Sequence, residues 1–457
     1  MCSATSPTVG RLISIHTEID GQEHLMKRRH LLTAGTTAAG LMLAARPQAQ
    51  EVEPLRVGAV LPLAGSAIPA GRVNLRAVAE AARMGLTFGE EDANRNGELF
   101  GATLKLTIAN APGPEAAART AQRLVAQDKV SVLVGGFTRE EAKALAGVAT
   151  QTGTLFLNIA ATSDALRHAC SANTFHIEAS AAMYLDAVFG WFVRAGYRRW
   201  YLVHDDGPDG RDQHERSLVS LKERHWAAEV ADNGVLRQDD SRDFDPVLAD
   251  IAAVKPDVVL LLTDWRTQLN FLSRYEVSGL KAPVTGFPEP AAQTREFYLA
   301  SRDMAPVAGS GYRAALWEAT LDAYGAREVN ARFNARWGRP MDPTAWAGWV
   351  ALKIAFEASL FAGGRDGASL AAYLAGEQAL FDVSKGIGMT FRPWDHQLRQ
   401  ALYLVKINPE ASPSLELEAM LARASLVGEL PAIYMPGTEP VERLDQLGEV
   451  DPARTCN

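Results

Sequence analysis

Several potential metal ligands are concentrated in the acidic segment 204–210, which reads HDDGPDG. Carboxylate oxygens are the ligands that Ca²⁺ and Mg²⁺ prefer in proteins. An EF-hand loop that began at Asp205 would need an oxygen ligand at its third position and a glutamate at its twelfth, but Gly207 and Arg216 stand there. This excludes an EF-hand loop and leaves a looser cation site formed by the three aspartates as an open alternative.

Motifs of the common catalytic centres do not occur in the sequence. It contains no G-x-S-x-G, no H-E-x-x-H, no nucleotide-binding P-loop and no C-x-x-C, and its nine histidines are scattered. Because nucleophilic and metal-dependent catalysis needs such groups at fixed spacing, we expect a protein that is not an enzyme and carries no cofactor.

An export signal is predicted near the start of the chain. A basic stretch at 27–30 (KRRH) precedes an uncharged, largely apolar run at 31–45. This order is typical of a secretory signal, and the paired arginines are typical of the twin-arginine route. The run is shorter than the roughly 20 residues that span a membrane. We therefore predict a signal at 26–50 behind an upstream extension at 1–25, and a periplasmic mature chain that is not inserted in the membrane.

Two cysteines, Cys170 and Cys456, remain after the predicted signal. In an oxidising compartment such a pair can form a disulfide. Two free thiols are the alternative, which stays open because a sequence does not give the distance between two side chains.

The composition is that of a globular protein, with 47% hydrophobic and 22% charged residues. The formal net charge of −8 argues against a polyanion such as nucleic acid as a partner. A chain of this length can hold two domains of ordinary size.

Short β-rich runs alternate with helical stretches along two blocks, about 52–170 and 175–305. The predicted strands lie at 55–61, 103–109, 130–135, 154–158, 199–204, 228–233, 257–262 and 283–286. The predicted helices lie at 72–89, 115–127, 139–151, 180–195, 212–226, 245–254 and 266–278. This alternation predicts α/β structure with parallel sheets, in which a ligand binds at the carboxyl ends of the strands.

The last third of the chain is less regular. We predict a helix at 343–362, which begins at a proline and ends at two glycines, a second helix at 368–376 and a strand at 400–407. From residue 409 onward we predict a polar, irregular tail.

Four segments resemble the leucine/isoleucine/valine-binding type of periplasmic solute-binding protein, the receptor component of ABC transporters for branched-chain amino acids and amides. They are VLPLAG at 60–65 followed by Gly71, VLVGGFT at 132–138, NIAATS at 158–163 and PTAWAGW at 343–349. The resemblance covers about 52–405. It implies the type I periplasmic binding fold, in which two Rossmann-like lobes with parallel sheets are joined by a multi-strand hinge and close on a small solute.

This fold implies how the chain is divided. We expect lobe 1 to consist of 52–170 and 306–383, and lobe 2 of 175–305 and 384–457 with the tail. The chain should then cross between the lobes near 171–175, 303–308 and 383–388.

A narrower resemblance lies in the string GMTFRPWDHQLRQ at 388–400. It is similar to the subgroup that accompanies PQQ-dependent alcohol dehydrogenase systems. The resemblance to this subgroup implies a link to alcohol oxidation in the periplasm.

The resemblance also implies the ligand-binding residues of lobe 1. In this family backbone amides and hydroxyls hold the carboxylate of the ligand, at positions that match Thr138, Ala160, Ala161 and Thr162. Such an anion site at strand–helix junctions needs no basic side chain. An alternative is that segment 162–164 simply caps a helix, and both roles can hold together.

In lobe 2 the family holds the ammonium of the ligand with a tyrosine and an acid. Here Asp209 stands where the tyrosine would fall, Glu289 matches the acid, and Trp265 falls near a second aromatic position. The aromatic residue of the first loop is replaced by Ile-Pro-Ala at 68–70. These departures argue against an ordinary branched-chain amino acid. The alternative for the two acids is that they are solvated loop carboxylates.

The function that we expect is the periplasmic solute-binding component of an ABC-type transport system. It would bind a small, carboxylate-bearing solute and work with a permease in the inner membrane. Two alternatives stay open: an accessory or sensor protein of a quinoprotein dehydrogenase system without a transport role, and an exported cofactor-binding enzyme.

Overall fold

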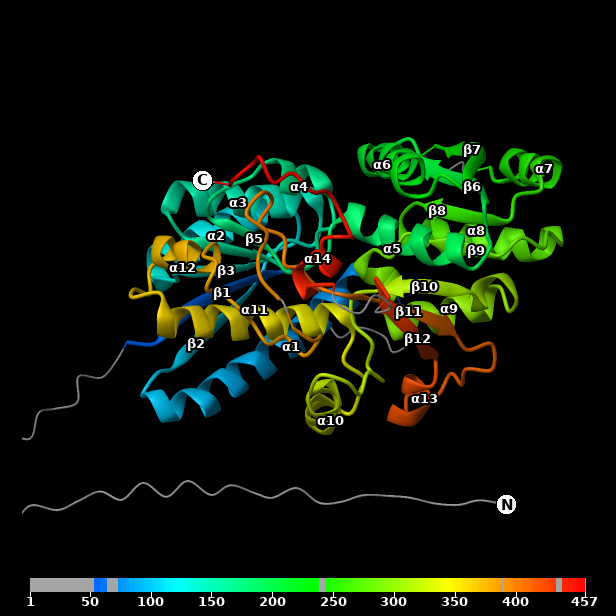
Figure 1. Ribbon diagram of the computed structural model, residues 1–457. Helices are drawn as coiled ribbons and strands as arrows, with labels where there is room; N and C mark the ends of the chain where they lie inside the picture. Colours follow the sequence, from blue (N-terminus) through cyan, green and yellow to red (C-terminus); the bar gives the residue numbers. More distant parts are fainter. Residues whose placement is uncertain (1–52, 64–72, 238–242, 388, 433–437, 457) are drawn as a thin grey trace, which may run out of the picture. The chain divides into compact units, whose positions relative to one another are not determined.

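The computed structural model describes residues 53–63, 73–237, 243–387, 389–432 and 438–456, whose strands form three sheets (Figure 1). Two of the sheets are parallel and have helices on both faces, as the alternation of strands and helices predicted. The predicted signal, the upstream extension and the first loop with its Ile-Pro-Ala segment lie outside the described residues.

The first sheet is parallel and has the strand order β2-β1-β3-β4-β5. Its strands are β1 (Leu55–Leu61), β2 (Leu104–Asn110), β3 (Val132–Gly135), β4 (Leu155–Asn158) and β5 (Thr174–His176). Both β3 and β4 are buried along their whole length, as expected for short apolar strands that are covered on both faces. One face packs against α2 (Pro114–Asp128) and α3 (Arg139–Thr152), and the other against α1 (Leu75–Gly97) and α11 (Pro343–Phe361).

The helices α1 and α11 pack together unusually closely because small residues face each other. A Cβ atom on Gly85 would lie only 1.9 Å from the carbonyl oxygen of Ala345. The helix α1 also continues past its predicted end at 89 as far as Gly97. Its first turn is capped by Asn74, whose side chain accepts a hydrogen bond of 2.8 Å from the backbone N–H of Ala77.

The second sheet is also parallel and has the order β7-β6-β8-β9. Its strands are β6 (Arg199–Asp205), β7 (Glu229–Leu236), β8 (Val258–Leu262) and β9 (Val284–Gly286). The helices α5 (Ala181–Arg194) and α6 (Pro208–Arg224) cover one face, and α7 (Asp245–Val254) and α8 (Trp265–Ser278) cover the other.

The helix α6 begins at Pro208 and not at the predicted residue 212. A proline at the first helical position and an acid in the first turn both favour a helix start, so Asp209 belongs to the helix and not to a loop.

The third sheet is antiparallel and has the order β10-β11-β12. Its strands are β10 (Tyr312–Ala315), β11 (Leu402–Ile407) and β12 (Ala424–Leu430). The prediction of an irregular tail after residue 409 is wrong, because this part holds α13 (Leu417–Leu421), β12 and α14 (Pro440–Leu444). The strand β12 forms because β11 offers it a free edge for pairing, which a local sequence pattern does not reveal.

One of the predicted crossings of the chain between the lobes lies near 303–308. This range falls at the end of α9 (Arg295–Met304) and the start of η3 (Ala308–Ser310), which both pack against α8. The following strand β10 contacts β9, so the chain stays beside the second sheet until Ala315. It then enters α10 (Ala326–Trp337), whose Phe333 packs against Phe88 of α1.

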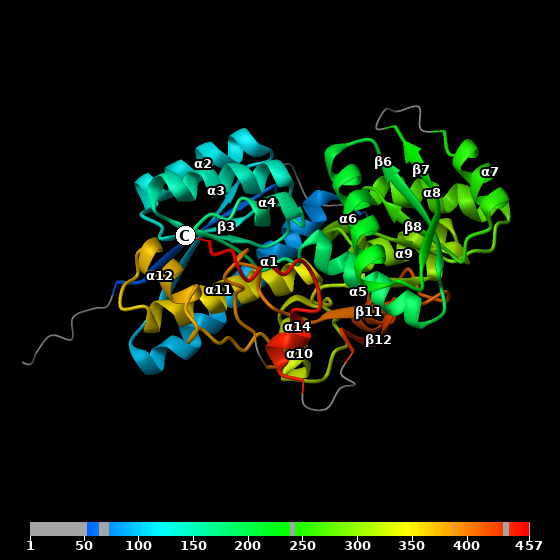
Figure 2. The same ribbon diagram turned by 45° about the horizontal axis from the view of Figure 1, so that its top comes forward.

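The C-terminal segment, residues 438–456, runs from α14 back to the first sheet (Figure 2). The sulfurs of Cys456 and Cys170 form a disulfide with 4.9 Å between the two Cα atoms, and Cys170 follows the short helix α4 (Asp164–His168). On its way the segment contacts α5, where the backbone N–H of Gly448 donates to Asp186 at 2.8 Å. The segment therefore connects elements of both parallel sheets.

The string at 388–400 holds this C-terminal segment in place. Asp445 accepts hydrogen bonds from Arg392 Nε at 2.8 Å and from Arg399 Nε at 2.9 Å. The indole N–H of Trp394 donates to the backbone oxygen of Glu449 at 3.0 Å. The most distinctive string of the sequence thus has a structural role in the described part of the chain.

Candidate functional site

A cavity of about 200 Å³ lies at the carboxyl ends of strands from both parallel sheets, and we call it the sheet-end cavity. Six of the seven residues predicted to bind ligand line it: Thr138, Ala160, Ala161, Thr162, Asp209 and Glu289. Its lining also includes Arg139, Ser163, Asp205, Thr263 and Asp264. The remaining predicted residue, Trp265, directly follows this lining in the sequence.

On the first-sheet side, two of the predicted backbone donors already have an acceptor. The side-chain oxygen of Asn158 accepts from the N–H of Ala161 at 3.0 Å and from that of Ala160 at 3.4 Å. In return the amide of Asn158 donates to the backbone oxygen of Ala161 at 2.8 Å. A ligand carboxylate would therefore compete with Asn158 for these amides, which favours the hydroxyl groups as its partners.

The threonine Thr138 ends the loop after β3 and caps α3. Its Oγ1 accepts from the backbone N–H of Glu141 at 3.2 Å, and its hydroxyl hydrogen is still available as a donor. The other predicted hydroxyl belongs to Thr162, which precedes α4.

The alternative that segment 162–164 caps a helix holds for α5, because the carboxylate of Asp164 accepts from the backbone N–H of Ala182 in its first turn at 3.1 Å. At the start of α4 the capping residue is Ser163, whose side chain makes no capping hydrogen bond in this described segment. Its Oγ instead accepts from Arg139 Nε at 2.8 Å. The serine thus orients a cationic side chain at the edge of the cavity.

Arg139 is a functional candidate that the sequence reasoning missed. It is the first residue of α3, and its Nε lies 2.8 Å from Asp209 Oδ1, while Nη2 pairs with Asp212 on the same helix α6. Burial works against the charged form, but the contacts with Asp212 and Asp209 outweigh it and raise the pKa of Arg139. A signal was present in the sequence, since a basic residue in the first turn of a helix opposes the helix dipole and needs a compensating partner.

The two predicted acids occupy different environments. The side chain of Asp209 is 55% exposed, so it is only partly desolvated; this desolvation raises its pKa, and the guanidinium of Arg139 opposes the rise. Glu289 is half-buried, and burial raises its pKa to about 8 even though it accepts a hydrogen bond of 2.5 Å from the backbone N–H of Trp265. Neither acid is a freely solvated loop carboxylate. At neutral pH Glu289 is protonated and can donate a hydrogen bond into the cavity.

Trp265 reaches the site through its backbone. It is the first residue of α8, and the guanidinium carbon of Arg266 lies 4.5 Å from the centroid of its ring. It contacts the cavity lining through the hydrogen bond from its backbone N–H to Glu289.

The acidic segment 204–210 lies in the described part of the chain and does not form a cluster of metal ligands. Asp205 accepts from the backbone N–H of Gly207 at 2.9 Å, and Asp209 faces Arg139. Over the described ranges, no group of three or more His, Cys, Asp or Glu residues could hold a metal ion. The described helices also include none that is long and apolar enough to cross a membrane.

Several solved structures share this architecture. An amino acid ABC transporter substrate-binding protein from Pseudomonas fluorescens Pf-5 matches with a TM-score of 0.69 and 19% identity, covering 84% of this chain and 97% of the other. A leucine-, isoleucine-, valine-, threonine- and alanine-binding protein from Brucella ovis in its closed conformation matches with a TM-score of 0.71 and 17% identity, covering 89% and 99%. A solute-binding protein of an ABC transporter from R. palustris in complex with benzoate matches with a TM-score of 0.63 and 21% identity, covering 82% and 96%. At these identities the likeness establishes the fold.

The sequence itself establishes the family. No curated protein matches the chain in a sequence search. A sequence model of the family described as "Periplasmic binding protein" matches residues 54–412, which is most of the chain and includes every strand of both parallel sheets. The chain therefore belongs to the periplasmic binding protein family.

Proposed function

We propose that this protein is the periplasmic solute-binding component of an ABC transport system, exported by its twin-arginine-type signal and read by an inner-membrane permease. Its membership of the periplasmic binding protein family supports this proposal. The sheet-end cavity supports it too, because the carboxyl ends of parallel strands are where such folds bind ligands.

The solute is small and bears a carboxylate. The observation that carries this assignment is the guanidinium of Arg139 beside the hydroxyls of Thr138, Thr162 and Ser163 in a cavity of about 200 Å³. A planar guanidinium binds a carboxylate through two parallel hydrogen bonds, and an incoming carboxylate would replace Asp209 and Asp212 as its partner. Benzoate, bound by the R. palustris protein, and the amino acids named for the Brucella ovis protein all carry this group.

Binding is coupled to closure of two lobes, one built on the first parallel sheet and one on the second, with β10 beside the second sheet and the C-terminal segment ending beside the first. The first-sheet side of the cavity offers Arg139 and the threonine hydroxyls, and the second-sheet side offers Asp209 and Glu289. Since contacts from both sides exist together only in the closed form, a bound solute shifts the population toward closure. The permease would recognise that form.

A link to PQQ-dependent alcohol oxidation belongs to the same proposal. Its support is the resemblance of the string at 388–400 to the subgroup that accompanies PQQ-dependent alcohol dehydrogenase systems. The described side chains of this string hold the C-terminal segment and are not part of the lining of the sheet-end cavity. Carboxylic acids produced by alcohol oxidation would be solutes of the expected class.

The proposal is tested by calorimetric titration of the purified protein with amino acids, aliphatic acids, aromatic acids, the matching alcohols and PQQ. We expect an acid to bind. Arg139→Gln should weaken that binding at least tenfold, because a charge-assisted pair is lost, and Thr162→Ala should weaken it by about three- to tenfold.

The matched control is Arg119→Gln, which removes an exposed, ion-paired arginine from α2. It should leave the affinity unchanged. If no acid binds, the accessory or sensor role is favoured over transport. If an acid binds equally well to the parent, Arg139→Gln and Thr162→Ala, the site assignment is wrong.

A further inference from the structure

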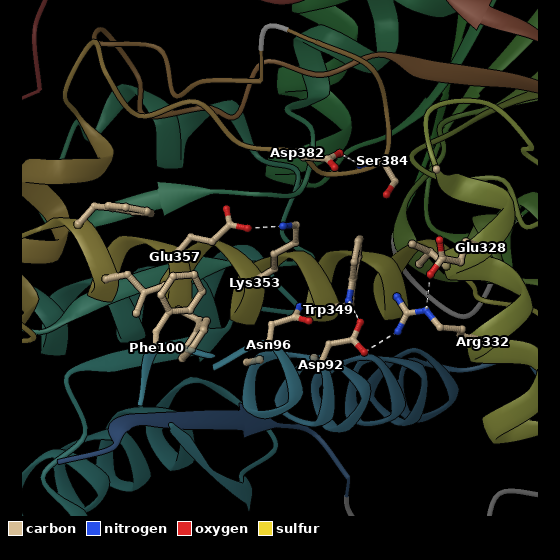
Figure 3. Close-up of a pocket in the computed structure, with 17 residues that line it drawn as sticks. Asp92, Asn96, Phe100, Glu328, Arg332, Trp349, Lys353, Glu357, Asp382 and Ser384 are labelled. Atoms are coloured by element: carbon tan, nitrogen blue, oxygen red, sulfur yellow. Dashed lines mark hydrogen bonds and ion pairs between the residues drawn. The ribbon is translucent and has the colours of Figure 1, made fainter. Parts of the chain in front are cut away.

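A second, larger cavity of about 450 Å³ lies between α1, α10 and α11, and we call it the helix cavity (Figure 3). It is also lined by Phe100 of η1 (Glu98–Phe100) and by the segment 382–384, which leads from α12 (Gly367–Leu374) toward β11. It shares no lining residue with the sheet-end cavity. Its volume lies within the roughly 300–1,000 Å³ that is usual for small-molecule sites.

The apolar part of the helix cavity is aromatic. Trp349 and Phe356 are buried beside it, whereas Phe100 and Phe361 are 65% and 66% exposed. Large aromatic side chains in contact with water are costly on the surface of a monomer, and here they lie around one hollow. This arrangement offers apolar area to the body of an organic molecule.

At one end of the helix cavity the charged side chains pair with one another. Asp92 accepts from Arg332 at 2.5 Å, from Arg95 at 3.0 Å and from the indole N–H of Trp349 at 3.0 Å. Arg332 also lies 3.6 Å from Glu328. These contacts fix Trp349 as one wall of the cavity.

At the other end the lining has two carboxylates and one ammonium group. Lys353 pairs with Glu357 of the following helical turn, and Asp382 faces them across the cavity with Ser384 (Figure 3). Burial raises the pKa of Glu357, the ammonium of Lys353 opposes this rise, and the charge of Asp382 adds to it. Over its whole lining the helix cavity has four carboxylates, Asp92, Glu328, Glu357 and Asp382, against the two cations Arg332 and Lys353.

We propose that the helix cavity binds an organic amine, with the ammonium group of the ligand between Glu357 and Asp382 and its apolar body against Phe356 and Phe361. An added cation would balance the surplus negative charge at this end of the cavity. It would also lie near aromatic faces, which attract cations more strongly than they attract neutral groups. A carboxylate ligand of the same shape would meet net repulsion. The site is separate from the solute site proposed above and does not depend on it.

The test compares three ligands of nearly equal shape on the parent protein by calorimetric titration at neutral pH. They are 2-phenylethylamine, 2-phenylethanol and 3-phenylpropanoate. We expect the amine to bind at least tenfold more tightly than the alcohol, and the carboxylate not to bind at this site. Because this comparison needs no variant, it holds even if a substitution impairs folding.

The variants Asp382→Asn and Glu357→Gln locate the site, since each keeps the shape of the side chain and removes one charge. Each should weaken amine binding at least tenfold. Glu115→Gln, an exposed carboxylate on α2 outside both cavity linings, is the matched control and should leave amine binding unchanged. Glu289→Gln shows whether the amine binds in the sheet-end cavity instead. Amine binding that is lost in Glu289→Gln but kept in Asp382→Asn would overturn the proposal, as would an amine that binds no better than the alcohol.

Discussion

Arg139 and Asp209 lie in direct contact at the sheet-end cavity, although one belongs to α3 and the other to α6. Sequence reasoning placed Asp209 in the site by its position relative to a known family, but not its partner. The reason is physical: an ion pair between two helices depends on their distance, which neither local sequence contains. The threonines were predicted from the same family resemblance, and they lie at one cavity because residues that follow parallel strands share the same edge of the sheet.

Glu289 allows a prediction about pH. Its pKa is about 8 in the folded protein, against 4.5 for an ordinary glutamate. Between these values the folded state holds a proton that the unfolded state has lost, so this group stabilises the fold fully below about pH 4.5 and loses its effect as the pH rises through 8. Glu178, which is buried and has a pKa raised to about 8, acts in the same direction.

We therefore expect the thermal stability of the ligand-free protein to fall between pH 5 and pH 8 by less in Glu289→Gln than in the parent. Scanning calorimetry in buffers across this range measures the difference. Glu115→Gln, an exposed position on α2, serves as the control and should follow the parent. Equal slopes for parent and Glu289→Gln would show that Glu289 ionises normally in the folded state.

At the scale of elements, hydrophobic pattern and turn residues predicted every strand of the two parallel sheets except β5 to within a few residues. The runs at 130–135 and 257–262, for example, became β3 and β8. The missed elements include β5, α10 and β12, which depend on contacts with other elements that a local pattern does not contain; Phe333 of α10, for example, packs against Phe88 of α1. The string at 388–400 was noticed for its composition, but its contacts with Asp445 required the folded chain.

The contact between α1 and α11 leads to a prediction about stability. Gly85→Ala would place a Cβ atom 1.9 Å from the carbonyl oxygen of Ala345, so the two helices would have to separate. We expect the free energy of unfolding to fall by about 1–3 kcal/mol, the usual cost of overpacking a core. Urea denaturation followed by circular dichroism measures this loss.

The matched control is Gly147→Ala on α3. Nothing lies within 4 Å of the added Cβ atom at this exposed helical position, so the variant should gain up to about 1 kcal/mol from helix propensity. A Gly85→Ala variant that is as stable as the parent would mean that the helices pack less closely than described.

At the scale of the whole molecule, the C-terminal segment connects elements of both parallel sheets. It contacts α5 through Gly448 and ends in the disulfide with Cys170 beside the first sheet. The two bonded cysteines are 286 positions apart in the sequence. A crosslink over so long a loop restricts the unfolded chain strongly.

The double variant Cys170→Ser/Cys456→Ser should therefore lose about 2–4 kcal/mol of stability. Denaturation with and without a reducing agent provides the measurement. Reductant should lower the stability of the parent toward that of the double variant and leave the variant unchanged. A parent that is insensitive to reductant after complete reduction of its thiols would contradict a stabilising role for the disulfide.

The sequence by itself determined the parallel α/β architecture, because strand periodicity and the residues that follow each strand are local properties of the chain, and its resemblance to a known family indicated positions that face the sheet-end cavity. Only the tertiary structure decided which side chains meet there. It brought Arg139 into contact with Asp209, and it placed the Ala161 N–H where it donates to Asn158. It also brought Cys170 and Cys456 close enough to form a disulfide and formed the helix cavity between α1, α10 and α11. Each of these depends on distances between segments far apart in the chain, and such distances arise only when the elements pack.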